Sequence, residues 1–231
     1  MNLCTHAAII SAFILVIGGW THRAASEPAA AVPFPIATVH FEQNATDGDK
    51  EVVFQVKAQT EGLDELIIRS PDGRTLVAFK APDASTLGMR QFRFETPEPS
   101  DSKSLRGAYP EGVYEFSGKT SAGAKLVGRS TLSHQLPATA TFTKPAPEAE
   151  NVSVKDFKIS WRPVEGVTSY IVTIDQSELD AHFMVRVPAS STSFALPDGF
   201  LARDTKYKMA IGTVTRQGNI SFVESTFATE K

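Results

Sequence analysis

The sequence predicts an all-β protein of two antiparallel β-sandwiches in tandem, preceded by an N-terminal signal segment. Three observations favour this fold class. Short segments that alternate apolar and polar residues, separated by turn residues, run from Ile36 to the end of the chain. No window carries a sustained apolar stripe with the 3.6-residue period of a helix. The proline-rich, polar stretch KPAPEAEN at 144–151 divides the segments into two sets, and a chain of 231 residues has room for two domains.

The first 31 residues differ from the rest and predict export. Residues 7–20, AAIISAFILVIGGW, form an uncharged apolar run. A bilayer span needs about 20 residues, so this run fits the core of a signal peptide better. Small residues follow it, and we expect cleavage after Ser26 or near Ala31, which makes 1–31 a signal peptide and the mature chain secreted or periplasmic. The segment before the run has no Lys or Arg, so a retained membrane anchor is the alternative.

Charge and cysteine content exclude several functions. The formal net charge is −3, and no stripe of Lys and Arg with interleaved aromatics is present, which argues against a nucleic-acid partner. The only cysteine is Cys4, which lies before the apolar run. A processed chain therefore has no disulfide, no thiolate nucleophile and no cysteine-based metal site.

The first half, 35–143, contains a series of predicted strands. SPDG at 70–73 joins two of them as a tight turn, because Pro71 fixes φ and Gly73 tolerates positive φ. Residues 96–111 are predicted to be a loop with one helical turn around Leu105. The predicted strands are EVVFQVKA (51–58), ELIIRS (65–70), TLVAFKA (75–81), RQFRFE (90–95), GVYEFSGKT (112–120), KLVGRSTLSH (125–134) and TATFTK (139–144).

The second half, 152–231, follows the predicted linker at 144–151. Alternation in FKISWRPV places Ile159 and Trp161 on one side of a strand, where a buried indole fills the space between two sheets. Tyr207, near the start of a late strand, is expected to tie its hydroxyl to a nearby backbone group. TRQGNIS is expected to form a hairpin with Gly218 and Asn219 at its tip. The further predicted strands are SYIVTIDQ, FMVRVPA, TSFAL, KYKMAIGTVT and ISFVESTFAT.

Residues of about 146–230 resemble a fibronectin type III domain. The resemblance rests on Trp161 in ISW, Tyr170 in VEGVTSYIVTI, Leu201 and Tyr207 in LARDTKY, and the closing FAT. The first half is similar to a bacterial immunoglobulin-like or E-set-type domain, through LIIRSPDGRTLVAF and PEGVYEFSGKTSAGAKLVGRSTL. Together the resemblances imply an exported, tandem-module protein of the adhesive or binding kind. The Arg-Gly-Asp tripeptide of some adhesive family members is missing.

Two acidic stretches are candidate cation sites. NATDGDKE at 44–51 offers oxygen ligands of the kind that Ca²⁺ prefers, but not the spacing of an EF-hand loop. We interpret it as a polar turn with Gly48 at positive φ, with an ion site as the alternative. TIDQSELDAH at 173–182 is interpreted as a solvated loop, because it satisfies no metal-ligand spacing. The side chains concerned are Asn44, Asp47, Asp49, Glu51, Asp175, Glu178, Asp180 and His182.

No residue is assigned a catalytic, cofactor-binding or metal-binding role. The histidines of the mature chain, His40, His134 and His182, stand in no motif of a hydrolase or metalloprotease, and no glycine-rich nucleotide loop occurs. The chain is therefore predicted not to be an enzyme. Asn44, Asn151 and Asn219 open N-x-[ST] triplets, which would be silent in a bacterial exported protein.

The predicted function is that of an exported, non-enzymatic binding or structural protein. Its partner is expected to be a protein or a surface glycan, held by loops at the sandwich ends or by an open sheet edge. A membrane enters only if the N-terminal segment is retained. The alternative is a carbohydrate-binding or enzyme-accessory module, in which Tyr109 or Phe200 would stack on sugar rather than cover the sandwich ends.

Overall fold

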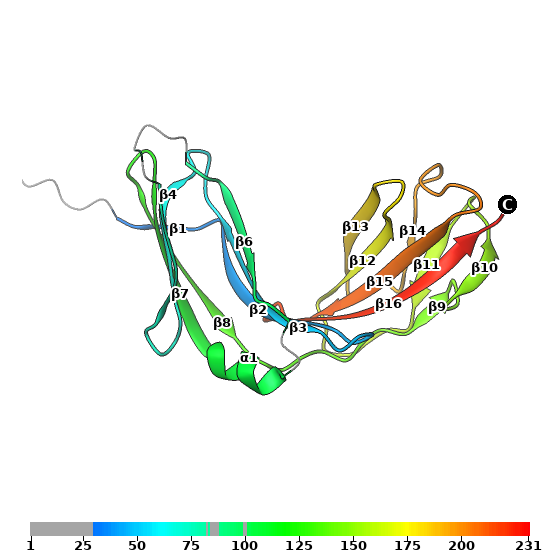
Figure 1. The fold of residues 1–231 in the computed structure, drawn as a ribbon, viewed down its shortest axis with the longest axis horizontal. Coiled ribbons are helices and arrows are strands. Elements are labelled where there is room, and N and C mark those ends of the chain that lie inside the picture. Colours follow the sequence, from blue (N-terminus) through cyan, green and yellow to red (C-terminus); the bar gives the residue numbers. More distant parts are fainter. Residues whose placement is uncertain (1–29, 82, 84–87, 99–100) are drawn as a thin grey trace, which may run out of the picture.

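The computed structural model describes residues 30–81, 83, 88–98 and 101–231, so nearly all of the predicted signal segment lies outside these ranges. The described residues form two β-sandwiches that make the arms of a wide V (Figure 1). Each sandwich has its own hydrophobic core. Within the described ranges, no helix is long and apolar enough to cross a bilayer. The fold class predicted from alternation, tandem β-sandwiches, is confirmed.

The first sandwich packs the sheet β1-β8-β7-β4-β5 against the strands β2-β3-β6. Leu105, in the single helix of the described chain, is 3% exposed and closes one end of the core, and the Asp101 side chain caps that helix by accepting from the amides of Lys103 and Ser104. Tyr114 donates its hydroxyl to the Pro110 carbonyl at 2.9 Å. The elements are β1 (Val32–Pro33), β2 (Ile36–Asn44), β3 (Lys50–Lys57), β4 (Leu63–Arg69), β5 (Thr75–Lys80), β6 (Gln91–Glu95), α1 (Ser102–Ala108), β7 (Gly112–Thr120) and β8 (Lys125–Leu132).

The second sandwich packs β14-β11-β9 against β13-β12-β15-β16, with β10 added to β16. Its strand order repeats that of the first sandwich, and in both a short extra strand, β1 or β10, pairs in parallel with the last strand. The elements are β9 (Phe142–Lys144), β10 (Ala149–Val152), β11 (Lys158–Trp161), β12 (Ser169–Gln176), β13 (Ala181–Pro188), β14 (Ser193–Ala195), β15 (Lys206–Val214) and β16 (Ile220–Thr229).

Trp161 and two tyrosines organise the second core as the sequence predicted. Trp161 is 2% exposed and its ring lies 5.2 Å from that of Tyr170. The Tyr170 hydroxyl accepts a hydrogen bond from the Val164 amide at 2.8 Å, which fixes the corner between β11 and β12. The Tyr207 hydroxyl accepts from the Ala202 amide at 2.8 Å, which is the expected tyrosine corner. These features and the strand order confirm the fibronectin type III-like fold of this half.

The connection between the two cores lies earlier than the sequence predicted. Residues 144–151, expected to be a linker, belong to the second sandwich, because Lys144 pairs with β11 and Ala149 pairs with β16. The strand predicted at 139–144 shrinks to β9 and also belongs there. The chain instead crosses between the sandwiches through 133–141, which forms no regular strand. The prolines of 144–151 lie where the chain crosses from one sheet of the second sandwich to the other. The linker prediction was wrong because such a proline-rich crossover has the same composition as a linker between domains.

Strand β2 is the one long strand that the predicted series omits. Its three central residues, Val39, His40 and Phe41, are all buried, so the apolar–polar alternation of a half-exposed strand is lost. Consecutive burial requires cover on both faces of β2. On the outer face, the β15–β16 hairpin of the second sandwich lies against His40, since a Cβ at Gly218 would come within 3.7 Å of the His40 Cβ.

Trp161→Ala is expected to lower the free energy of unfolding by about 3–5 kcal/mol, as for other buried aromatic residues. Trp161→Phe is expected to cost clearly less, because the indole Nε1 is buried without a hydrogen-bond partner, so Phe removes no bond. Urea titration followed by far-UV circular dichroism measures both variants. Equal losses for Ala and Phe would contradict this description of the indole.

Candidate functional site at the junction of the sandwiches

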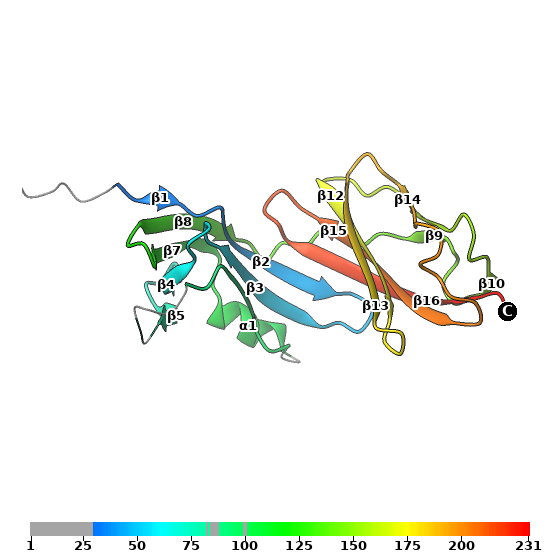
Figure 2. The same cartoon turned by 90° about the horizontal axis from the view of Figure 1, so that it is seen from above.

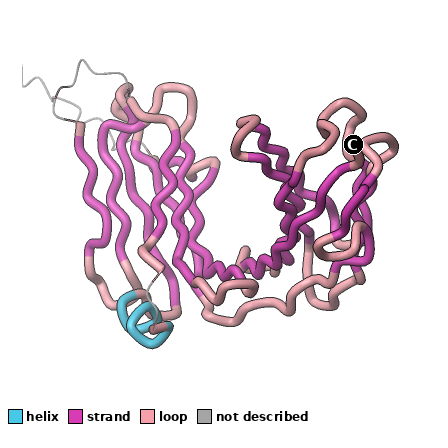
Figure 3. Tube along the Cα trace, turned by 45° about the vertical axis from the view of Figure 1, so that its right-hand side comes forward, coloured by secondary structure: helices cyan, strands magenta, loops and turns pink. Residues whose placement is uncertain are grey.

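One β-sheet runs through both sandwiches. Strand β16 pairs in parallel with β2 over Ile220–Phe222 and Glu42–Asn44, which joins the strands in the order β13-β12-β15-β16-β2-β3-β6. Figures 1 and 3 show this sheet passing along the base of the V. Each of the two strands would otherwise be the open edge of its own sandwich, with unpaired amides and carbonyls. Pairing them satisfies both edges and fixes the angle between the arms.

Asn219, at the tip of the β15–β16 hairpin, holds the junction together. Its side chain is buried, with the residue only 1% exposed. The side-chain oxygen accepts from the Phe41 amide of β2 at 2.9 Å. The side-chain nitrogen donates to the carbonyls of Ser133 and Gln135 at 2.8 and 2.9 Å. One amide therefore ties the hairpin both to the first sandwich and to the connecting segment.

Two buried hydroxyls continue this attachment along the connecting segment. Ser221 donates to the Pro137 carbonyl at 2.7 Å, and Thr213 donates to the Ala138 carbonyl at 2.8 Å. Both side chains belong to residues with no exposed surface. The segment 133–141 is thus bound to β15 and β16 rather than free to swing, which makes the junction a rigid part of the fold.

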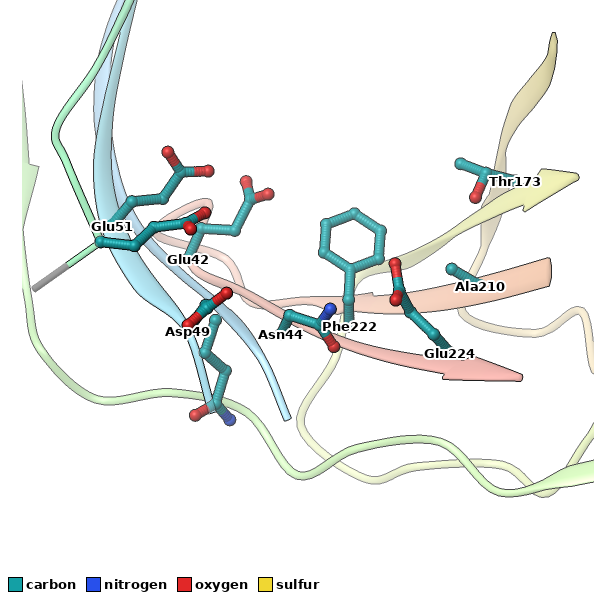
Figure 4. Close-up of a pocket in the computed structure, with 10 residues that line it drawn as sticks. Glu42, Asn44, Asp49, Glu51, Thr173, Ala210, Phe222 and Glu224 are labelled. Atoms are coloured by element: carbon teal, nitrogen blue, oxygen red, sulfur yellow. The ribbon is translucent and has the colours of Figure 1, made fainter. Parts of the chain in front are cut away.

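A hollow with an acidic lining opens above the shared sheet. Figure 4 shows Glu42, Glu51, Phe222 and Glu224 projecting from the same side of this sheet, from strands of both sandwiches. The hollow has a volume of about 220 Å³, and Asp49 and Glu98 also line it. The Phe222 ring lies over Gly212 of β15, where a Cβ would come within 2.6 Å of a ring carbon. Gly212 therefore makes the space that the ring occupies.

The carboxylates of this hollow repel one another. Partial burial, together with the charges of Glu42 and Glu95, raises the pKa of Glu51 to about 7. The charge of Asp49 raises the pKa of Glu98. Two of the carboxylates have cationic or potentially cationic partners, since Lys208 lies 2.7 Å from Glu224 and His40 lies 3.1 Å from Glu42. Negative charge in the hollow therefore exceeds the positive charge beside it.

A second, larger hollow continues from the first. It has a volume of about 530 Å³, and Glu42 and Phe222 line both hollows. One wall is polar and comes from β2, β3 and β6, while the other comes from the second sandwich and is largely apolar. We call the two hollows together the junction groove. Its further lining residues include Thr38, His40, Gln55 and Arg93 on the polar wall and Ile171, Met184, Arg186, Val214 and Ile220 on the other.

The acidic stretch 44–51 forms the polar turn that the sequence predicts. The Asn44 side chain accepts from the Thr46 amide at 3.0 Å and donates to Asp47 at 2.9 Å, and Gly48 has a φ of 91°. Within the described ranges, no group of three His, Cys, Asp or Glu side chains is arranged to hold a metal ion. Two residues of this stretch, Asp49 and Glu51, line the groove.

The three candidate histidines each have a separate partner. The His40 ring bonds Glu42, the His134 ring lies 2.8 Å from the Tyr109 carbonyl oxygen, and the His182 ring bonds Asp175. In the described part of the chain, each ring contacts a carboxylate or a carbonyl by these bonds rather than a hydroxyl nucleophile. Of the three, only His40 lines the junction groove.

The aromatic residues proposed as sugar platforms are packed as end plugs. The Tyr109 ring lies 6.0 Å from Phe54, and the Phe200 ring lies edge-on to Phe183 at 5.7 Å. The aromatic side chain in the groove is instead Phe222, which the sequence did not single out. The feature that identifies Phe222 is its pairing with Gly212 on the neighbouring strand, and this pairing is known only from the register of β15 and β16.

Comparison with known proteins gives similarity to solved structures alone, since no family model and no curated protein matches this chain. The fibronectin(III)-like modules of Clostridium thermocellum CbhA share 11% identity, with a TM-score of 0.33, over 85% of this chain and 91% of that chain. A two-domain fibronectin type III segment of chicken tenascin shares 16% identity, with a TM-score of 0.31, over 84% and 98%. The fn3 domain of human collagen alpha-1(XX) shares 25% identity, with a TM-score of 0.31, over 42% and 89%.

Asn219→Asp is expected to loosen the junction, because it places a carboxylate against two carbonyl oxygens. Leaving such buried groups unpaired costs about 1–3 kcal/mol each. We expect small-angle scattering to show a broader range of inter-arm distances, together with a lower melting temperature. Asn151→Asp, at an exposed position, is the matched control. Unchanged scattering and melting for Asn219→Asp would show that this amide does not hold the arms.

Glu51→Gln is expected to stabilise the protein at neutral and alkaline pH and to have little effect in acid. A raised folded-state pKa means that ionised Glu51 favours unfolding. The stabilising contribution of protonated Glu51 is therefore fully present below the pKa of the unfolded chain and is lost as pH rises toward 7. The melting-temperature difference between variant and parent should therefore grow between about pH 4.5 and pH 7. Glu61→Gln, on an exposed turn, is the control. A difference independent of pH would contradict the assignment.

Proposed function

We propose that this chain is an exported, non-enzymatic binding protein that holds its partner in the junction groove. The observation that carries the proposal is the shared sheet, which joins two β-sandwiches, the second of them fibronectin type III-like, and leaves a groove built from both. Modules of this fold commonly serve structural or binding roles. The rigid attachment of 133–141 supports binding, because a preformed surface avoids the cost of ordering it on contact.

The lining of the groove is that of a recognition surface. Met184 is 59% exposed at its edge, beside the apolar side chains of Ile171 and Phe222. An exposed apolar patch with a charged rim is typical of sites for proteins or other ligands. Charged side chains of both signs, including Glu42 and Arg93, surround this patch and supply specificity.

Export is the second part of the proposal. It is supported by the apolar run at 7–20 and the small residues after it, and it places the groove in the periplasm or outside the cell. The partner is then a protein or a glycan of that compartment.

The groove can be tested by charge reversal. Arg93→Glu with Met184→Glu changes two exposed groove positions, and Arg129→Glu with Val113→Glu makes the same charge change on the outer face of β7 and β8. We expect the groove variant to lose at least tenfold in affinity for ligands captured from cell-envelope protein and glycan fractions, and the control to keep its affinity. Both variants should keep the parent's melting temperature within a few degrees.

The outcome has two informative alternatives. Equal retention of ligand by both variants would exclude the groove as the binding site. Loss limited to glycan ligands would establish the carbohydrate-binding alternative, with Phe222 as the stacking residue in place of Tyr109 and Phe200.

A further inference from the structure

We infer that the occupant of the junction groove is an extended, positively charged segment of a partner protein, with a Lys or Arg side chain in the acidic hollow and an apolar side chain against Met184. This inference rests on the proposed binding function and adds the chemistry of the partner. It follows from three properties of the groove: its unbalanced charge, the position of one aromatic ring, and its continuation along the sheet face.

The acidic hollow is complementary to a cation. Glu42, Glu51 and Glu98 of the first sandwich face it together with Glu224 of the second. Burial, and after it the charges of Glu42 and Glu95, raise the pKa of Glu51, and the charge of Asp49 raises the pKa of Glu98; the repulsive part of both effects is relieved when a positive charge enters. A Lys or Arg side chain there makes charge-assisted hydrogen bonds, which are the stronger class.

Phe222 is placed to contact the same cation. Its ring stands between the carboxylates of Glu42 and Glu224, on the open side of the sheet (Figure 4). An aromatic face attracts an ammonium or guanidinium group, and the attraction grows as the site excludes water. Gly212 beneath the ring keeps the ring close to the sheet and the hollow open above it.

The groove fits a chain segment better than a single ion. In the described ranges no three ligands are grouped for a metal, whereas the hollow leads past Phe222 into a larger space. There Ile171, Val214 and Ile220 form an apolar floor, and the flexible thioether of Met184 adapts to the side chain beside it. An extended segment advances about 3.3 Å per residue, so neighbouring side chains reach the acidic and the apolar parts in turn.

Two arginines make the two ends of the groove differ in charge. Arg186, whose guanidinium donates to the Ser169 hydroxyl at 3.0 Å, and Arg93, which pairs with Glu95, both line the larger hollow. They disfavour a second basic side chain at that end and favour carbonyl or carboxylate groups. The partner segment is therefore basic at one end only, followed by an apolar residue.

The test uses two capped hexapeptides and the full chain. The probe is acetyl-Gly-Lys-Lys-Leu-Val-Gly-amide, and its charge-reversed counterpart is acetyl-Gly-Glu-Glu-Leu-Val-Gly-amide. Amide chemical shifts of ¹⁵N-labelled protein are followed during titration at low and high salt. We expect the lysine probe to shift amides of β2, β3 and β16, to bind at least tenfold more tightly than the glutamate peptide, and to weaken at high salt.

Matched variants locate the charge effect. Asp49→Asn, Glu51→Gln and Glu98→Gln together remove three carboxylates of the hollow at nearly constant volume. At a pH above the pKa of Glu51, Glu61→Gln, Glu150→Gln and Glu178→Gln make the same change in net charge at exposed positions elsewhere. We expect at least a fivefold weaker Kd for the probe in the first triple variant and no change in the second. Equal weakening in both, or shifts confined to other strands, would overturn the inference.

Failure of this inference differs from failure of the proposed function. If the charge-reversal variant Arg93→Glu with Met184→Glu loses a native ligand while the lysine probe does not bind, the groove is a binding site with a different occupant. If neither the native ligand nor the probe depends on groove residues, both conclusions are wrong.

Discussion

The buried amide of Asn219 is the interaction on which the shape of this protein depends. It accepts a hydrogen bond from the Phe41 amide and donates to the carbonyls of Ser133 and Gln135. Its side-chain oxygen and nitrogen are thus both hydrogen-bonded inside a buried junction, where an unpaired polar group is costly. The same contacts align β16 with β2, so the parallel pairing of the two sandwiches follows from them.

The groove results from the pairing of β16 with β2, which joins the edges of the two sandwiches into one sheet. The outer faces of both sandwiches become neighbouring walls, and side chains that would be ordinary surface residues, such as Glu42 and Glu224, converge. The acidic hollow is lined by both sandwiches, and the apolar floor of the second sandwich lies opposite the polar wall of the first. The like charges that act on Glu51, those of Glu42, Glu95 and Glu98, all belong to the first sandwich, so this electrostatic cost lies in the wall that the first sandwich contributes.

A rigid two-module framework with a composite groove fits a binding role. The connecting segment is fixed by Thr213 and Ser221, so the two walls keep their spacing without a partner. Aromatic side chains at the sandwich ends, Tyr109 and Phe200, are used for packing. Under the proposed binding role, a ligand in the groove would meet Phe222 and the carboxylates beside it.

The sequence by itself determined the local structure of each sandwich: most strands, the turn at Gly73, the helical turn around Leu105, and the burial of Trp161. Alternation and turn residues act over a few positions, so they are readable along the chain. Only the tertiary structure decided the omitted strand β2, the true connection at 133–141 and the groove. These depend on contacts such as that between Phe41 and Asn219, 178 positions apart, and hydrogen bonds between such distant segments leave no periodic pattern in either one.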